Sequence, residues 1–330
     1  MSYWYQEKTH RKSSESTLIN KNKRPAISTL AFLALLGLVI WFIVKYILHY
    51  KEEIKNFEWN IPPHLLMISL LLVFTGYAII AIAWGIMEYL ITNHKPHWLQ
   101  AYRVYIIALL GKYLPGKVWG IAGRGYLSTT DKTKRVQIGL AAIFETLWFN
   151  TIGIMVFALF FPFALTKWEI DPALRNTAFI GILLVITVSY PGIYFPMINK
   201  LLKILSQPAL PRIPKWGDLT FVSISYVIVY LLWASALLVL ISPYTSLSWT
   251  DAVAVFALFA LAWVIGFAVL VAPSGIGVRD AILMAGLVSI FPGIPETTFF
   301  ITIVFRLIFT AAEIIGFFLA LLIKKTTITN

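Results

Sequence analysis

The segment from Gly111 to Lys117, GKYLPGK, groups glycine, proline and lysine in a spacing that could bind phosphate. Gly111, four residues and then Gly116-Lys117 reproduce the spacing of the phosphate-binding loop of nucleotide hydrolases. That loop continues with Ser or Thr as a Mg²⁺ ligand and lies between a strand and a helix, whereas Val118 follows here between two apolar runs. Pro115 also lacks an amide hydrogen that a phosphate cradle would use. The segment therefore does not predict a nucleotide site.

The same residues predict a broken helix that can bind an anion. Pro115 and Gly116 interrupt helices, and the half-helix that follows begins with free N–H groups and a partial positive charge. Three cations surround this break: Lys112, Lys117 and Arg124. They repel one another unless an anion is bound, which favours a phosphate site. The alternative is that they are ordinary cytoplasmic-side cations facing water.

A second break of the same kind occurs in VAPSGIGVRDAIL. Its helix-breaking and capping residues are Pro273, Ser274, Gly275 and Gly277. Arg279 falls in the first turn of the following helix, where a cation opposes the helix dipole and Asp280 partly compensates. These two residues predict either a second anion-binding point or a structural ion pair at a helix interface.

Three further charges, Glu145, Arg306 and Glu313, lie inside long apolar runs. Charges within a membrane are costly, usually face the interior of a helix bundle and often mark function. Arg306 and Glu313 are seven residues apart and so share one helix face. Glu145 is expected to pair with Arg124 or Arg306. The acidic residues Glu145, Asp280 and Glu313 are either proton relays or partners in purely structural ion pairs.

Composition identifies the elements that must hold these residues. Of the 330 residues, 59% are hydrophobic and only 13% charged, so we predict an all-α, polytopic integral membrane helical bundle. The absence of cysteine excludes thiol chemistry, and all five histidines lie in the first third of the chain. We therefore expect no catalytic residue, metal or cofactor. The net charge of +12 comes largely from loops beside apolar runs, which argues against a nucleic-acid partner.

Six continuous spans and two interrupted regions are predicted. The spans are Ala26–Ile47, Leu65–Leu90, Val136–Leu165, Thr177–Ile198, Leu219–Ile241 and Thr298–Ile323. The positive-inside rule puts both termini in the cytoplasm if the first interrupted region, Trp98–Leu127, enters and leaves on that side. Its arms, about 24 and 17 Å long as helix, are too short to span comfortably, so a re-entrant hairpin fits. The second region, Asp251–Phe291, is either an external hairpin or two crossings.

If both regions are hairpins, the chain contains two inverted repeats, each with a broken or re-entrant helix pair. The predicted organisation is a basic cytoplasmic tail (1–25), one transmembrane domain (26–324) and a cytoplasmic tail (325–330). Within the transmembrane domain the first repeat covers 26–165 and the second 176–323. We expect a multi-pass protein of the bacterial or archaeal cytoplasmic membrane.

The motifs KYLPGKVWGIAGRGYL and APSGIGVRDAIL, followed by helices with Glu145 and Arg306 respectively, resemble the transmembrane, flippase-like domain of lysylphosphatidylglycerol synthases. That family has Leu-Pro-Gly followed by an arginine, then Pro-Gly-Gly-Leu-Gly-Val-Arg-Glu, and an arginine in the next helix. This chain departs from the pattern at Ser274, at Asp280 and after Glu145, where an arginine often follows. Seven residues follow the last predicted span, so we expect a stand-alone member without the aminoacyl-transferring domain.

The resemblance implies translocation of an anionic phospholipid or a polyprenyl-phosphate-linked glycolipid between leaflets. The expected substrate-binding cations are Lys112, Lys117, Arg124, Arg279 and Arg306. One alternative is a non-transporting accessory protein of cell-envelope glycan or lipid synthesis that binds a lipid-linked sugar or a partner glycosyltransferase. Another is an integral-membrane glycosyltransferase, although no acid, base and nucleophile set is recognisable. Whether the chain is an enzyme stays open.

Overall fold

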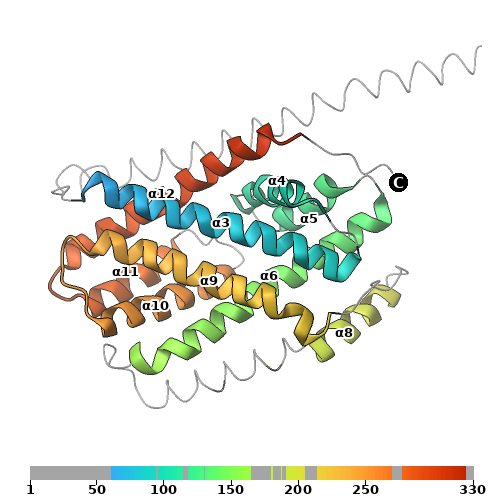
Figure 1. Ribbon diagram of the computed structural model, residues 1–330. Helices are drawn as coiled ribbons and strands as arrows, with labels where there is room; N and C mark the ends of the chain where they lie inside the picture. The colour runs from blue at the N-terminus through green and yellow to red at the C-terminus, as the bar shows by residue number, and fades with distance from the viewer. Residues whose placement is uncertain are drawn as a thin grey trace, which may run out of the picture. The chain divides into compact units, whose positions relative to one another are not determined.

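The computed structural model describes residues 61–93, 96–113, 118–129, 131–164, 180, 187, 191–204, 214–269 and 277–324. The chain divides into two compact units, Met1–Asn56 and Phe57–Asn330, and every described residue belongs to the second. The described residues form α-helices and one short 3-10 helix, with no strand among them (Figure 1). The predicted all-α class is therefore confirmed.

Five described helices are long and apolar enough to cross a membrane: α3 (Pro63–Thr92), α6 (Lys132–Ala164), α9 (Trp216–Ile241), α10 (Trp249–Ala268) and α12 (Pro295–Leu322). Four of them contain or closely match the predicted spans that begin at Leu65, Val136, Leu219 and Thr298. The span predicted at 26–47 lies outside the described residues, as does most of 177–198. Helix α8 (Pro191–Ile204) covers the end of the latter.

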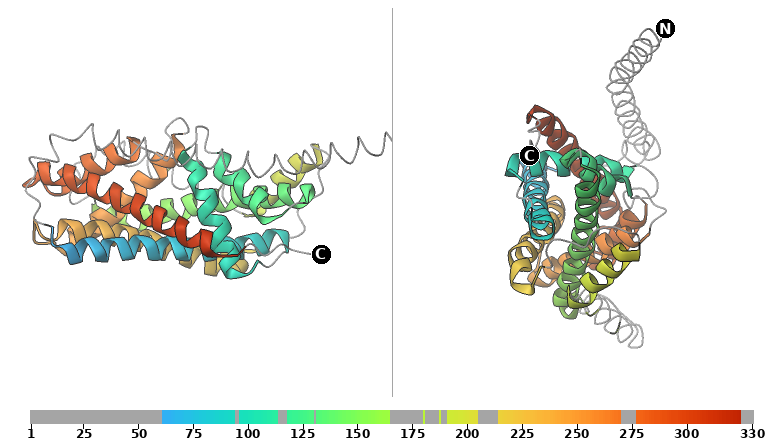
Figure 2. Two further views of the ribbon diagram at one scale, coloured as in Figure 1. Left: turned by 90° about the horizontal axis from the view of Figure 1, so that it is seen from above. Right: turned by 90° about the vertical axis from the view of Figure 1, so that its right-hand side faces the viewer.

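Helices α3 and α9 lie side by side, as Figures 1 and 2 both show. Their close approach depends on Gly76, because a Cβ there would lie 2.1 Å from Nε1 of the Trp233 indole. The same indole donates a hydrogen bond to the Val73 carbonyl at 3.0 Å, which satisfies its buried N–H. Helix α6 packs against α10, so residues 61–164 (here the first half) are in contact with residues 191–324 (the second half).

The first interrupted region forms two short arms. The first consists of α4 (Trp98–Leu109) and the 3-10 helix η1 (Leu110–Tyr113), and the second is α5 (Val118–Ser128). The arms meet backbone to backbone, since a Cβ on Gly111 would lie 2.6 Å from the Gly120 nitrogen. Only glycine fits such a contact, which explains part of the glycine content of this segment. Pro115, Gly116 and Lys117 lie outside the described residues.

The second interrupted region consists of α10, of 20 residues, and α11 (Val278–Ile290), of 13 residues. Gly277 precedes α11 with a φ of +82°, a backbone conformation that favours glycine. Its N–H donates to Asp280 Oδ2 at 3.2 Å, so the carboxylate caps the start of the helix. Pro273, Ser274 and Gly275 lie outside the described residues.

Figure 1 shows α4 and α5 toward one end of the long helices and α10 and α11 toward the other. Helix α10 is long enough to cross a membrane and α11 is not. These lengths do not distinguish a hairpin from two crossings, so the inverted repeat stays a prediction. The predicted domain boundaries stay predictions for the same reason.

Candidate functional site

A cavity of about 280 Å³ lies between the two halves of the chain. Its wall comes from α3, α4, η1, α5 and α6 of the first half and from α9, α10 and α11 of the second. The aromatic residues of the wall are Tyr77, Tyr105, Phe149, Trp233, Trp263 and Phe267. Its charged residues are Lys112, Arg124, Glu145 and Arg279. Three of the five predicted binding cations therefore face one largely apolar space.

Arg124 on α5 is held within the first half. Its Nη1 lies 2.6 Å from Glu145 Oε2 on α6, and both side chains are buried. The guanidinium also lies 4.5 Å from the ring of Trp84 and 4.6 Å from that of Tyr105, at cation–π distance. Tyr226 on α9 donates to the other oxygen of Glu145 at 3.2 Å. Of the two pairings considered for Glu145, the structure contains the one with Arg124.

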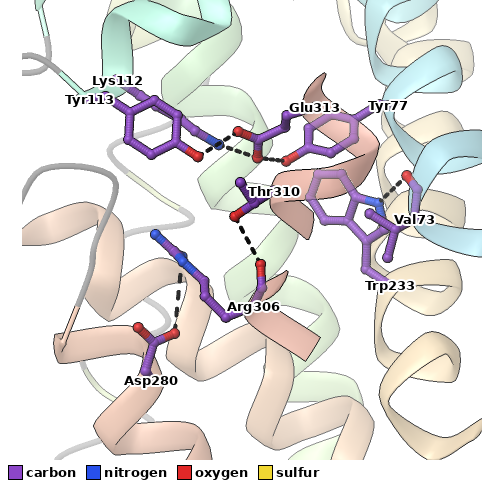
Figure 3. A network of polar contacts seen from close by, with 9 residues as sticks. All are labelled: Val73, Tyr77, Lys112, Tyr113, Trp233, Asp280, Arg306, Thr310 and Glu313. Atoms are coloured by element: carbon purple, nitrogen blue, oxygen red, sulfur yellow. Dashed lines mark hydrogen bonds and ion pairs between the residues drawn. The ribbon is translucent and has the colours of Figure 1, made fainter. Parts of the chain in front are cut away.

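Lys112 on η1 is bonded across the halves to Glu313 on α12. In Figure 3 the lysine and Tyr113 approach the carboxylate from one side and Tyr77 approaches it from the other. Lys112 and Tyr77 both donate to Oε1, and Tyr113 donates to Oε2 at 2.9 Å. Glu313 is 3% exposed, so these three donors replace the water it has lost.

Arg306 on α12 faces Asp280 of α11, as Figure 3 shows. Its Nη1 lies 4.0 Å from Asp280 Oδ1. Arg306 is buried but does not line the cavity. Among the described residues, each predicted acidic residue thus faces a different cation: Glu145 faces Arg124, Glu313 faces Lys112 and Asp280 faces Arg306.

Arg279, at the start of α11, differs from the other cations. Its guanidinium carbon lies 4.8 Å from the ring of Trp263 and 5.3 Å from that of Phe309. The residue is 7% exposed, and its Nε is buried without a hydrogen-bond partner. Within the part of the chain that the structure describes, Arg279 makes no ion pair with a carboxylate. A Cβ on Gly266 of α10 would lie 2.9 Å from Arg279 Cβ, so the glycine lets α11 approach.

The predicted site residues are thus partly brought together. Lys112, Arg124 and Arg279 line the cavity, Arg306 lies outside its wall, and Lys117 is not described. Sequence reasoning missed Tyr77, Tyr113 and Trp263, which hold Glu313 and Arg279. A tyrosine hydroxyl within an apolar run needs a polar partner, which is the signal that could have found the first two. The described residues contain no group of three or more His, Cys, Asp or Glu that could hold a metal ion.

Comparison with known proteins identifies the family. Residues 24–316 match the family described as the lysylphosphatidylglycerol synthase TM region. Searches of curated proteins and of solved structures gave no match. The family match covers most of the chain, and the five long apolar helices agree with it. The chain therefore belongs to the lysylphosphatidylglycerol synthase transmembrane-region family and is a multi-pass membrane protein.

Proposed function

We propose that the protein translocates an anionic phospholipid or a polyprenyl-phosphate-linked glycolipid between the leaflets of the cytoplasmic membrane. The lipid phosphate binds in the cavity between the halves, where Arg279 is its main partner. Both termini face the cytoplasm, in keeping with the basic loops.

The observation that carries this proposal is the environment of Arg279. A buried guanidinium normally has a carboxylate or several hydrogen-bond acceptors, since burying an unpaired charge is costly. Arg279 instead has two aromatic rings and an unpartnered Nε, and it lines a cavity. A phosphate oxygen in the cavity would supply the missing acceptors, and a guanidinium can bind phosphate through two parallel hydrogen bonds.

The other lining cations support the same role more weakly. Lys112 and Arg124 add positive potential to the cavity, but each already has a carboxylate. The rest of the wall is aromatic and aliphatic, so contact with lipid tails is more favourable there than contact with water. A phosphate that crosses a low-dielectric region without a compensating charge is strongly disfavoured. A cavity that offers cations to the phosphate and an apolar wall to the tails lowers the energy barrier to this crossing.

The test is leaflet exchange in proteoliposomes. The purified protein is reconstituted with fluorescent phosphatidylglycerol or a fluorescent undecaprenyl-phosphate analogue, and dithionite quenching follows exchange. We expect exchange above the protein-free rate for at least one lipid. Arg279→Ala should reduce it at least tenfold, Arg279→Lys should retain part of it, and the exposed control Lys203→Ala on α8 should leave it unchanged.

Two results would contradict the proposal. Exchange at the protein-free rate for every lipid, with folded protein, would exclude translocation under these conditions and favour a binding or accessory role. Undiminished exchange by Arg279→Ala would exclude Arg279 from the path of the lipid.

A further inference from the structure

The described charges in the cavity wall and directly behind it nearly cancel. Its described cations are Lys112, Arg124 and Arg279, and its described carboxylate is Glu145. Glu145 neutralises Arg124 at 2.6 Å, and Glu313, behind the wall, neutralises Lys112. One positive charge, that of Arg279, then has no carboxylate within the described lining.

Among the described residues, each carboxylate near Arg279 is already paired with another cation. Trp263 of α10 and Phe309 of α12 lie against its guanidinium. Asp280 follows it in the chain, but its two oxygens face Arg306 and the N–H of Gly277. Ring faces attract a cation far less than a carboxylate does. Counted over the described residues, the site therefore carries one positive charge more than it has carboxylates.

From this count we infer that the cavity selects lipids with a single net negative charge, which means a phosphodiester headgroup such as that of phosphatidylglycerol. The inference rests on the proposed function and names the charge class of its substrate. A phosphodiester monoanion offers Arg279 two oxygens and brings no second charge into the aromatic part of the wall.

Other headgroup charges fit the wall less well. A phosphomonoester carries roughly −1.5 to −2 at pH 7, and its excess charge would have to displace Glu145 or Glu313 from a cation. Phosphatidylethanolamine and lysyl-phosphatidylglycerol bring an ammonium group. That group would be repelled by Lys112, Arg124 and Arg279, while Glu145 is already taken by Arg124.

The experiment compares headgroups on identical labelled acyl chains. Phosphatidylglycerol, phosphatidic acid, phosphatidylethanolamine and lysyl-phosphatidylglycerol are offered to the full-length protein. Native mass spectrometry measures retention of the lipid, and proteoliposomes measure exchange. We expect phosphatidylglycerol to be preferred over each of the others by about tenfold or more, since each mismatch leaves one charge uncompensated. Soluble glycerophosphoglycerol should compete weakly, because it lacks the tails that the apolar wall accommodates.

Charge variants test the count directly. With Glu313 behind the wall counted, Arg279→Gln makes the described charges of the cavity sum to zero. The preference for phosphatidylglycerol over phosphatidylethanolamine should then fall at least tenfold, whereas Arg279→Lys should keep it. Glu145→Gln adds one positive charge and should raise retention of phosphatidic acid relative to phosphatidylglycerol. Lys203→Gln, on the exposed side of α8, is the matched control that changes net charge outside the cavity.

The outcomes separate this inference from the proposed function. Exchange that is equal for all headgroups, or unaltered preferences in both charge variants, would overturn the monoanion selectivity and leave translocation standing. Selective retention of phosphatidylglycerol without any exchange would overturn translocation and support the selectivity. Equally strong competition by glycerophosphoglycerol would identify a soluble phosphodiester as the ligand and overturn the assignment to a lipid.

Discussion

Removing the hydroxyl of Tyr113 should destabilise the protein by a predictable amount. The hydroxyl donates to Glu313 Oε2 at 2.9 Å, and both residues are buried. Tyr113→Phe keeps the ring and deletes one hydrogen bond to a charged acceptor. Such bonds contribute about 1.5–3 kcal/mol, but bonds between helices in membranes rarely exceed about 1.7 kcal/mol. We therefore expect a loss of about 1–2 kcal/mol and a fall in Tm of about 2–5 °C.

Tyr102 on α4 provides the matched control. Its hydroxyl also donates to α12, but the acceptor is the neutral Gly316 carbonyl at 3.4 Å and the tyrosine is only part-buried. Tyr102→Phe should cost at most about 0.5 kcal/mol, because the deleted bond is long, uncharged and partly replaced by solvent. Both variants are measured by thermal unfolding in detergent, followed through tryptophan fluorescence.

A double-mutant cycle identifies the acceptor. Glu313→Gln removes the charge that Lys112 neutralises, and we expect it to cost about 2–4 kcal/mol, less than a fully dry pair because the lysine is 23% exposed. Tyr113→Phe should then cost about 1 kcal/mol less in this background than in the wild type. Equal losses for Tyr113→Phe and Tyr102→Phe, or strictly additive losses in the cycle, would refute the assignment of Glu313 as a shared acceptor.

Two further predictions concern packing and pairing. Gly266→Ala should lower stability by about 1–3 kcal/mol, because the added methyl group would lie 2.9 Å from Arg279 Cβ. A Cβ on Gly139 would meet no atom within 4 Å, so Gly139→Ala should raise stability by up to about 1 kcal/mol through its higher helix propensity. Thermal unfolding of the two variants checks this, and a stable Gly266→Ala protein would show that α10 and α11 are not held that closely. Arg124 and Glu145 form a buried ion pair at 2.6 Å, so Arg124→Gln or Glu145→Gln alone leaves one buried charge without its partner. Each single variant should lose about 3 kcal/mol of stability. The double variant should lose less than the sum, because it leaves no unpaired charge. Additive shifts in Tm would contradict that pairing.

Long apolar runs were the most predictable part of the fold. Val136–Leu165 and Leu219–Ile241 each correspond to one helix, because about 20 apolar residues in a row allow little else in a bilayer. The described helices stop before Leu114 and begin again at Val118, on either side of the first predicted interruption, whose own residues lie outside the described ones. The sequence did not decide whether Asp251–Phe291 is a hairpin or two crossings, because the positive-inside rule places both termini in the cytoplasm in either case.

The candidate site was predictable as a set of charges but not as a set of pairs. Intramembrane position alone selected Glu145, Arg306 and Glu313. Which cation meets which carboxylate depends on how helices distant in sequence are rotated, and the pairing of Lys112 with Glu313 joins residues 201 positions apart. The aromatic rings around Arg279 could not be predicted for a related reason. The sequence does not show which face of an apolar helix a tryptophan occupies, and therefore which neighbour it contacts.

Two cations of the cavity differ in what a movement would do to them. Arg124 and Glu145 belong to α5 and α6 of the same half, while Lys112 and Glu313 join η1 to α12 of the other. A displacement of α12 away from η1 would leave the pair of Arg124 and Glu145 intact and would deprive Lys112 of its counter-ion. The widened space would then hold two uncompensated positive charges in its described lining where the closed one holds one. Opening and anion affinity would rise together, so a bound headgroup would stabilise the open arrangement through electrostatics alone.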